Sequence, residues 1–314
     1  MSGSIAGRLA LTAPILLLVS FLVFSLLLLL PGDPALVILG PEATPEQVKK
    51  LAAELGTNRP IAVQYVSWLG RALTGDFGRS TRTGQPVVDA VAERLAPSIE
   101  LAVVAMLMAV VVGGGLGLAA GWRPGGLVDQ LTRAFATLGI AIPTFWLGIL
   151  LILWISLHLG LLPPSGYVPF GEDPAANLRA MILPGITVAA TMAAVIARIV
   201  RASLLEVGHE MYIVTARAKG LSEGAIFGRH VLRNALIPIL TVTGLQAGRL
   251  MGGMVITETI FAIPGIGRLA VDSVLARDFL TVQGVVLVMA VWVLVANLVV
   301  DVLNLLADPR VTRL

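Results

Sequence analysis

Six long apolar windows constrain this chain more than any other feature of its sequence. They cover approximately residues 9–30, 98–121, 134–158, 181–200, 236–256 and 281–303. A bilayer core is about 30 Å thick, and a helix rising about 1.5 Å per residue crosses it with about 20 apolar residues. The 314-residue chain is 57% hydrophobic and 13% charged, with a mean hydropathy of +0.91, which is far from soluble usage. We therefore predict an all-α, polytopic membrane protein with six transmembrane helices; the short, Ala-rich window at 181–200 is the weakest.

The first window predicts an uncleaved N-terminal transmembrane helix within residues 1–30. Arg8 supplies a small positive flank, as in a signal peptide. The apolar run of about 22 residues is, however, longer than the roughly 7–15 residues of a signal-peptide core. No convincing small-x-small cleavage site precedes the PGDP sequence at 31–34. A membrane anchor is therefore favoured over a cleaved signal.

The distribution of Lys and Arg orients the predicted helices. With the N-terminus inside, the inner segments contain Arg8, Arg123, Arg133, Arg198, Arg201, Arg217, Lys219, Arg229, Arg233, Arg310 and Arg313. The short outer loop at 163–178 contains neither Lys nor Arg. The positive-inside rule then predicts that both termini and the polar segment 206–238 are cytoplasmic. The same bias explains the net charge of +3, so no nucleic-acid partner is implied.

Residues 31–97 are predicted to form an extracytoplasmic segment between the first two helices. Thr44 or Pro45 can begin a helix that ends at Gly56, and residues 63–73 have apolar side chains near helical spacing. Two interpretations stay open for this segment. It is either a docking surface for a soluble partner or a long connection.

The sequence contains no recognisable catalytic or metal-binding constellation. Cysteine is absent, and the three histidines lack metal-ligand spacing. No G-x-x-x-x-G-K-[ST] sequence is present, which excludes a P-loop ATPase in this chain. We therefore expect no catalytic residues, no metal site and no cofactor here, and a membrane protein of this kind must be driven by another chain.

Within the second window, Gly113, Gly117 and Gly121 recur every four residues. Small residues at this spacing let helix backbones approach closely, so we predict a helix-packing face. A flexible hinge is the alternative.

Polar residues inside the predicted spans are functional candidates by default. In the sixth span Asn297 and Asp301 lie on one helical face, and ion pairing of this face with Arg198 or Arg201 is the favoured interpretation. Arg249 lies about two turns from one end of the fifth window and more than three turns from the other, so it requires a carboxylate partner or a water-filled path. Both roles stay open for Arg249.

The polar segment between the fourth and fifth windows predicts two short helices separated by a glycine. Residues 201–219 are compatible with a helix except at Gly208, and Gly220 occupies the position of a helix C′ glycine. Ser222 can cap a second helix that extends to about Ala235, before Pro238 begins the next span. An ordinary positive-inside loop rarely keeps helical periodicity over this length.

This segment resembles the EAA signature of bacterial ABC-importer permeases, E-A-A-x3-G-x9-I-x-L-P. The sequence TARAKGL…RHVLRNALIP at 215–238 is similar to the corresponding sequences in the dipeptide/oligopeptide/nickel branch of that family. Further similar motifs occur in the same order along nearly the whole chain: PGDP (31–34), GDFGRS (75–80), RTGQPV (82–87), AIPTFWLG (141–148), IPGIGRL (263–269), RDFLTVQG (277–284) and DPR (308–310). Val214 and Arg233 depart from the signature at its Glu and Pro, which puts any role of those two side chains in doubt.

The resemblance implies an ABC type I importer transmembrane fold over residues 95–307, with a coupling loop at 201–235. It implies that an ATP-binding subunit docks on Tyr212, Thr215, Ala216, Arg217, Ala218, Lys219, Gly220, His230 and Asn234. The implied partners are a second homologous permease, two ATP-binding subunits that hold ATP and Mg, an extracytoplasmic substrate-binding protein and the lipid of the bacterial inner membrane.

The resemblance also implies a permease that forms half of a translocation path working by alternating access. Short peptides are the favoured substrate, with nickel or another small solute as the alternative. An ion-coupled secondary transporter is a remote alternative, because only Asp301 is a candidate intramembrane carboxylate and it is off-centre. A membrane-embedded enzyme is disfavoured, since no histidine lies well inside a span.

Overall fold

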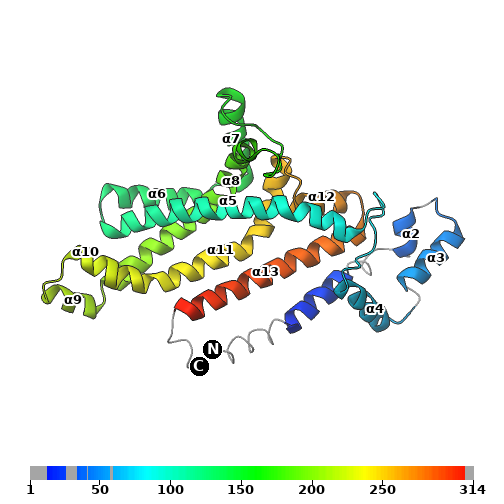
Figure 1. Ribbon diagram of the computed structural model, residues 1–314, viewed down its shortest axis with the longest axis horizontal. Coiled ribbons are helices and arrows are strands. Elements are labelled where there is room, and N and C mark those ends of the chain that lie inside the picture. The colour runs from blue at the N-terminus through cyan, green and yellow to red at the C-terminus, as the bar shows by residue number, and fades with distance from the viewer. Residues whose placement is uncertain (1–12, 26–33, 41, 57–58, 308–314) are drawn as a thin grey trace.

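The computed structural model describes residues 13–25, 34–40, 42–56 and 59–307, and these residues are helical apart from turns and one isolated bridge between Arg79 and Pro86. Figure 1 shows the arrangement. After a helix at Ala13–Ser25, the elements are α2 (Pro34–Leu39), α3 (Pro45–Leu55), α4 (Ile61–Leu73), α5 (Val87–Trp122), α6 (Leu127–Ala141), α7 (Thr144–Leu151), η1 (Ile152–His158), α8 (Pro174–Gly208), α9 (Met211–Ala218), α10 (Glu223–Ile226), η2 (Phe227–Val231), α11 (Leu232–Ile260), α12 (Ile266–Leu275) and α13 (Phe279–Ala307).

Four helices in the described part of the chain are long and apolar enough to cross a membrane. They are α5, α8, the continuous helix Glu223–Ile260 and α13 over Phe279–Val299. The predicted span at 134–158 is instead a bent pair, in which α6 and the α7–η1 helix meet at 103°. If the two bent helices together form a single span, they are the fifth span of the described residues. Residues 9–12 and 26–30 of the first window lie outside the described residues, so a total of six spans stays a prediction.

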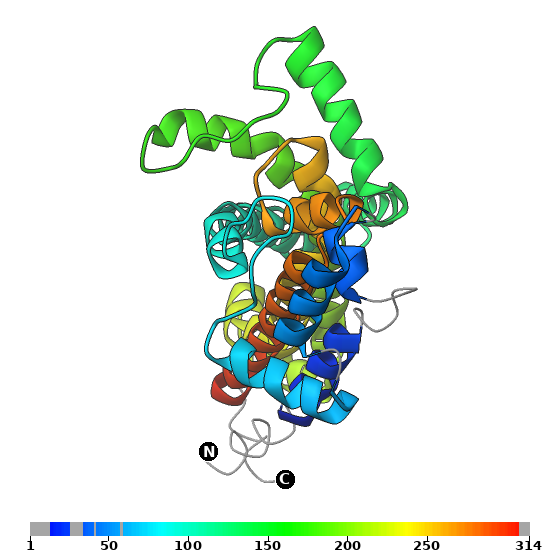
Figure 2. The ribbon, with the colours of Figure 1, turned by 90° about the vertical axis from the view of Figure 1, so that its right-hand side faces the viewer.

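The bend between α6 and α7 has a local cause. Ile142 is extended, with ψ of 123°, and it immediately precedes Pro143. A residue before proline is sterically pushed out of the α region, so the helix ends there and restarts at Thr144. The expected single helix at 134–158 is therefore corrected to two, and Figures 1 and 2 show α7 projecting away from the lengthwise helices.

Helix α8 is the most buried of the spans. Within its most apolar stretch 72% of the residues are buried, against 28–33% in the other three. It packs most extensively against α5 and also against α11 and α6. The window with the weakest sequence signal is thus the centre of the fold, because small alanines allow neighbouring helices to approach closely.

The segment before α5 packs on α13. Phe24, Tyr65 and Trp68 form an aromatic cluster from the Ala13–Ser25 helix and α4, and Gln283 of α13 donates to the Val23 carbonyl at 3.2 Å. Helix α3 begins and ends as its sequence predicts. Thr44 forms a capping box, and Gly56 terminates the helix with φ of +71°.

The bundle has two distinct ends. Helices α9 and α10 lie together at one end, which we call the tip, and α12 lies toward the opposite end, which we call the far end (Figure 1). The chain crosses repeatedly between them, since α5 and α13 run from the far end toward the tip and α11 runs back.

Candidate functional site

The tip is built from a helix break followed by a glycine turn. Helix α8 ends at Gly208, and Glu210 is extended, with ψ of 142°, before α9 begins at Met211. The helical stretch predicted at 201–219 is therefore two helices. The break lies beside Gly208, the one residue of the stretch that is not compatible with a helix in the sequence. A separate short helix is thus placed across the end of the bundle.

Helix α9 exposes most of its surface and is attached through two side chains. Ile213 is fully buried and Ala216 is 8% exposed, and both belong to the main core. Met211, Tyr212 and Val214 are exposed by 76%, 44% and 50%. The remaining candidate residues on this element, Thr215, Arg217, Ala218 and Lys219, are also exposed. Met211, Tyr212 and Val214 thus leave apolar surface exposed on a short helix that lies beyond the spans.

Gly220 ends α9 in a Schellman motif. Its φ is +81°, its N–H donates to the Arg217 carbonyl at 2.9 Å, and the Leu221 N–H donates to the Ala216 carbonyl at 3.3 Å. No atom lies within 4 Å of the position that a Cβ would take. The glycine is therefore required by backbone conformation and not by lack of space.

A bidentate ion pair crosses the glycine turn. Arg217 donates to both carboxylate oxygens of Glu223, at 2.6 and 3.1 Å. The hydrogen bond to Glu223 raises the pKa of Arg217. Because the two side chains are 51% and 64% exposed, water and salt screen this pair.

The second predicted helix does not end at Ala235. Ser222 caps α10, and the helix continues through the π-helical turn η2 and past Pro238 to Ile260. A proline removes a single backbone donor, which membrane helices tolerate where neighbours satisfy the freed carbonyl. The tip and the fifth span are therefore one continuous element.

His230 and Asn234 lie on this continuous helix and not on α9. The Asn234 amide donates to the His230 carbonyl at 2.7 Å. Nearby, Phe227 packs edge-on against Trp122 at the end of α5, with ring centroids 4.7 Å apart. The Phe227–Trp122 contact therefore connects the continuous helix Glu223–Ile260 to the end of α5.

The three glycines of α5 face α8. A Cβ added at Gly113 would lie 2.5 Å from the Ala193 carbonyl oxygen, and one at Gly117 would lie 2.6 Å from Val200 Cβ. One at Gly121 would lie 2.6 Å from a methyl carbon of Leu204. All three positions therefore require glycine at the present helix separation.

The ion pair between α6 and α8 differs from the expected one. Arg201 donates through two nitrogens to both carboxylate oxygens of Asp129, which is 1% exposed, so Arg201 already has a partner and is not free for Asp301. The side chain of Asp301 lies outside the described residues. Asn297 is exposed, and its Oδ1 lies 2.9 Å from where a Cβ at Gly248 would be. Asp129 is not among the residues predicted from the sequence, although an acidic residue in the first turn of a helix is a recognisable signal.

At the far end a buried carboxylate connects α5, α11 and α12. Ser98 donates to Glu258 at 2.6 Å, the Ile266 N–H donates to Ser98 Oγ at 2.8 Å, and the Arg268 N–H donates to Glu258 at 2.9 Å. Glu258 is 1% exposed, and its carboxylate occupies the space that a Cβ at Gly265 would need. Sequence reasoning missed Glu258 as well.

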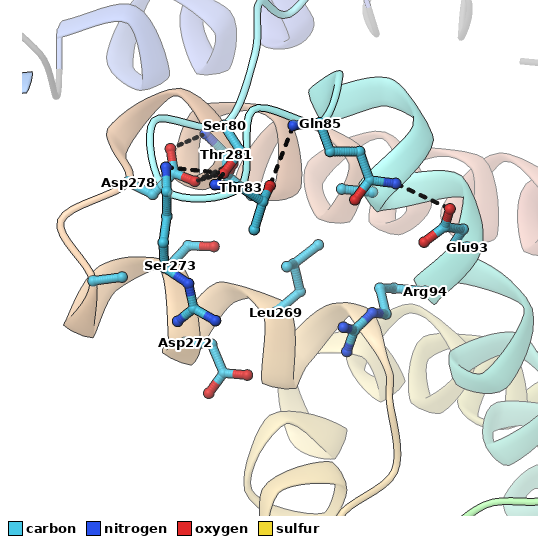
Figure 3. Close-up of a pocket in the computed structure, with 13 residues that line it drawn as sticks. Ser80, Thr83, Gln85, Glu93, Arg94, Leu269, Asp272, Ser273, Asp278 and Thr281 are labelled. Carbon is cyan, nitrogen blue, oxygen red and sulfur yellow. Dashed lines mark hydrogen bonds between the residues drawn. The ribbon is translucent and has the colours of Figure 1, made fainter.

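A second set of contacts at the far end holds the loop 75–86 (Figure 3). Asp278 accepts hydrogen bonds from Ser80 Oγ at 2.5 Å and from Thr281 Oγ1 at 2.7 Å. Gln85 donates to Glu93 at 3.0 Å beside a hollow of about 100 Å³. The loop is thus fixed to both α5 and the start of α13.

Tyr167 adds a further link from the connection between η1 and α8. Its hydroxyl donates to Glu100 at 2.9 Å. Burial and the neighbouring carboxylate raise the pKa of Tyr167 to about 12. The phenol therefore stays a hydrogen-bond donor from neutral to moderately alkaline pH.

Arg249 lines a hollow of about 240 Å³ bounded by α7, α8 and α11. The polar residues around it are Thr144, Thr191 and Gln246. Arg249 is exposed, and among the described residues it forms neither an ion pair nor a hydrogen bond. The same described residues contain no group of three or more His, Asp or Glu that could hold a metal ion.

Comparison with protein families matches nearly all of the chain. Residues 112–313 match the family described as "Binding-protein-dependent transport system inner membrane component", and residues 3–102 match "Binding-prot-dependent transport system membrane comp, N-term".

Curated relatives match over their full length. The chain is 42% identical over 311 residues, 99% of each chain, to a putative peptide transport system permease protein of Brucella suis biovar 1. It is 38% identical over 326 residues, 97% of each chain, to the dipeptide transport system permease protein of Alkalihalophilus pseudofirmus. It is 42% identical over 299 residues, 95% of each chain, to the glutathione transport system permease protein of Escherichia coli strain K12.

Solved structures support the fold. An inward-facing methionine ABC transporter chain aligns with a TM-score of 0.54 and 19% identity, covering 69% of this chain and 96% of that one. An amino acid ABC transporter chain aligns with a TM-score of 0.54 and 16% identity, covering 69% and 93%. With this fold and with family matches spanning both halves, the chain belongs to the binding-protein-dependent transport system inner membrane component family.

Proposed function

We propose that this chain is the permease subunit of an ATP-driven importer of short peptides and forms half of its translocation path. Three relatives that match along 95–99% of this chain are named as peptide, dipeptide and glutathione permeases. A path of this kind works by rigid-body switching between two packed states of the bundle. The solutes named for these relatives favour peptides over nickel.

In this proposal the complex contains a second homologous permease, two ATP-binding subunits and an extracytoplasmic substrate-binding protein. ATP and Mg²⁺ bind to the ATP-binding subunits, so this chain performs no catalysis. It is a multi-pass protein of the bacterial inner membrane, with both termini and the tip in the cytoplasm. The distribution of Lys and Arg supports this orientation.

The observation that carries the proposal is the exposed face of α9. Met211, Tyr212 and Val214 are exposed there, while Ile213 on the opposite face is fully buried in the core that also contains residues of α8 and α11. A subunit docked on this face can therefore move α9, and the packed core transmits the motion to two spans. The coupling residues proposed for this contact are those of 212–220, with His230 and Asn234 at the base.

Copurification from membranes that express the whole importer tests this proposal. Tyr212→Asp places a charge in the docking face, and we expect it to reduce recovery of the ATP-binding subunits by about tenfold, as loss of one aromatic hot spot can. Gly224→Ala is the matched control, because Gly224 is exposed on the neighbouring helix and a Cβ there meets no atom within 4 Å.

Uptake of a labelled tripeptide into the same membranes tests the substrate. Wild type and Gly224→Ala are expected to take it up with ATP, and Tyr212→Asp is not. Unchanged copurification in Tyr212→Asp would reject α9 as the docking helix. Uptake of nickel without peptide would retain the importer and reject the substrate.

A further inference from the structure

We propose that the hollow beside Arg249 is a carboxylate-binding site in the translocation path and recognises the C-terminal carboxylate of the peptide. This inference rests on the proposed function and deepens it. The hollow brings together a cation without an ion pair among the described residues, a glutamine side chain and the start of a helix that has no side-chain cap.

Arg249 lies inside the predicted fifth span and not at either of its ends. At about 1.5 Å per residue it is roughly 16 Å from Ile260 and roughly 26 Å from Leu232 along the axis. A charged side chain at such depth faces either a partner or a water-filled cavity, because lipid exposure is costly. Since Arg249 has no hydrogen bond or ion pair among the described residues, the open hollow is its available surrounding.

Gln246 supplies a second polar group to the same space. It lies one helical turn before Arg249, is 8% exposed and lines the hollow. Its side-chain amide has no hydrogen-bond partner among the described residues. Its amide atoms keep some accessible surface, so they are open to a ligand or water in the hollow.

The start of α7 contributes a third group that favours an anion in the hollow. Thr144 lines the hollow at the first position of α7, and Pro143 before it provides no side-chain cap. The first N–H groups of a helix lack intrahelical acceptors and carry a partial positive charge. The 103° break between α6 and α7 thus places the first residue of α7 in the wall of the hollow that Arg249 also lines.

These three features select a small anion with planar, bidentate acceptor geometry. A guanidinium binds a carboxylate through two parallel hydrogen bonds, and amide or backbone N–H donors complete its remaining lone pairs. The hollow of about 240 Å³ is smaller than the roughly 300–1,000 Å³ of a complete small-molecule site. The hollow therefore holds only the charged end of a substrate, and the rest of the substrate lies in the translocation path formed with the second permease.

Uptake by the assembled importer tests the inference, with trialanine and trialanine amide as paired substrates. The binding protein is the same in every sample, so a change in the acid-to-amide uptake ratio between variants arises in the permease. We expect Arg249→Gln to lower that ratio by about tenfold, the equivalent of one lost charge-assisted interaction. Arg249→Lys should retain part of the preference, and Gln246→Leu should lower it less.

Three outcomes would overturn the inference. The first is an unchanged ratio in a well-expressed Arg249→Gln complex. The second is equal loss of both peptides together with poor subunit assembly in Arg249→Gln and Gln246→Leu, which would assign these residues a structural role. The third is uptake of neither peptide by wild type, which would reject the proposed function as well and so is distinguishable from the first two.

Discussion

At the tip, α9 is joined to α10 by a guanidinium–carboxylate pair whose side chains are 51% and 64% exposed. At the far end, α12 is joined to α5 and α11 through Glu258, which is 1% exposed. Both links use a carboxylate and cross a glycine-containing turn. They differ in how far their side chains are exposed to water.

That difference determines what each end can do. An exposed ion pair contributes little to stability because salt and water compete for both partners. A buried carboxylate that accepts several hydrogen bonds is costly to break, since its donors are then left unpaired. The far end is therefore expected to move as one unit with the spans, whereas the tip can rearrange when another subunit docks on it.

The largest effect is expected from removing the buried carboxylate. Glu258→Ala leaves the Arg268 N–H without its acceptor and Ser98 Oγ–H without a partner, and it opens a cavity at the far end. We expect a loss of about 3 kcal/mol in the free energy of unfolding. Thermal unfolding of the detergent-solubilised protein measures it as a lowered midpoint.

Glu258→Gln is the matched control. It keeps the volume and one acceptor oxygen, so a smaller loss is expected. An unchanged midpoint in Glu258→Ala would show that the far end is no more firmly held than the tip, and it would remove the contrast between the two ends.

A smaller effect on stability, but a large one on function, is expected at Gly220. Gly220→Val forces a β-branched residue to φ of +81°, a strain of about 1–2 kcal/mol confined to an exposed turn. We expect normal insertion but loss of substrate-stimulated ATP hydrolysis and of transport, because the orientation of α9 changes. Gly220→Asn is the control, since Asn tolerates the left-handed region. Normal transport by Gly220→Val with unchanged ATPase stimulation would show that α9 is not the lever.

Much of this fold follows from local sequence signals. Apolar windows locate four of the spans, the Thr44 capping box and Gly56 bound α3, and the position of Gly220 predicts its Schellman turn. These features depend on residues a few positions apart. The break before Pro143 is of the same kind, and the steric restriction on the preceding residue was available to predict it.

The links through buried carboxylates depend on contacts between residues that are distant in the sequence. Asp129 and Arg201 are 72 positions apart, and Ser98 and Glu258 are 160 apart. No periodicity or cap identifies such a pair, because which helix faces meet is decided by packing of the whole bundle. The sequence alone therefore allows Arg198 or Arg201 to pair with the polar face of α13, whereas packing pairs Arg201 with Asp129.

The smallest effect is expected from Arg217→Ala, which removes the exposed pair with Glu223. Its unfolding midpoint should equal that of wild type, while amide hydrogen exchange at 219–224 becomes faster because the turn loses its crosslink. At about 1 M salt the Debye length falls to about 3 Å, so wild type and variant should then exchange alike. Arg201→Ala provides the opposite case, since it removes both hydrogen bonds from Arg201 to the buried Asp129 and leaves only the exposed Arg133 at 3.9 Å. It should therefore lower the midpoint at every salt concentration. Equal salt dependence in the two variants would show that burial does not separate the contacts of the tip from those of the core.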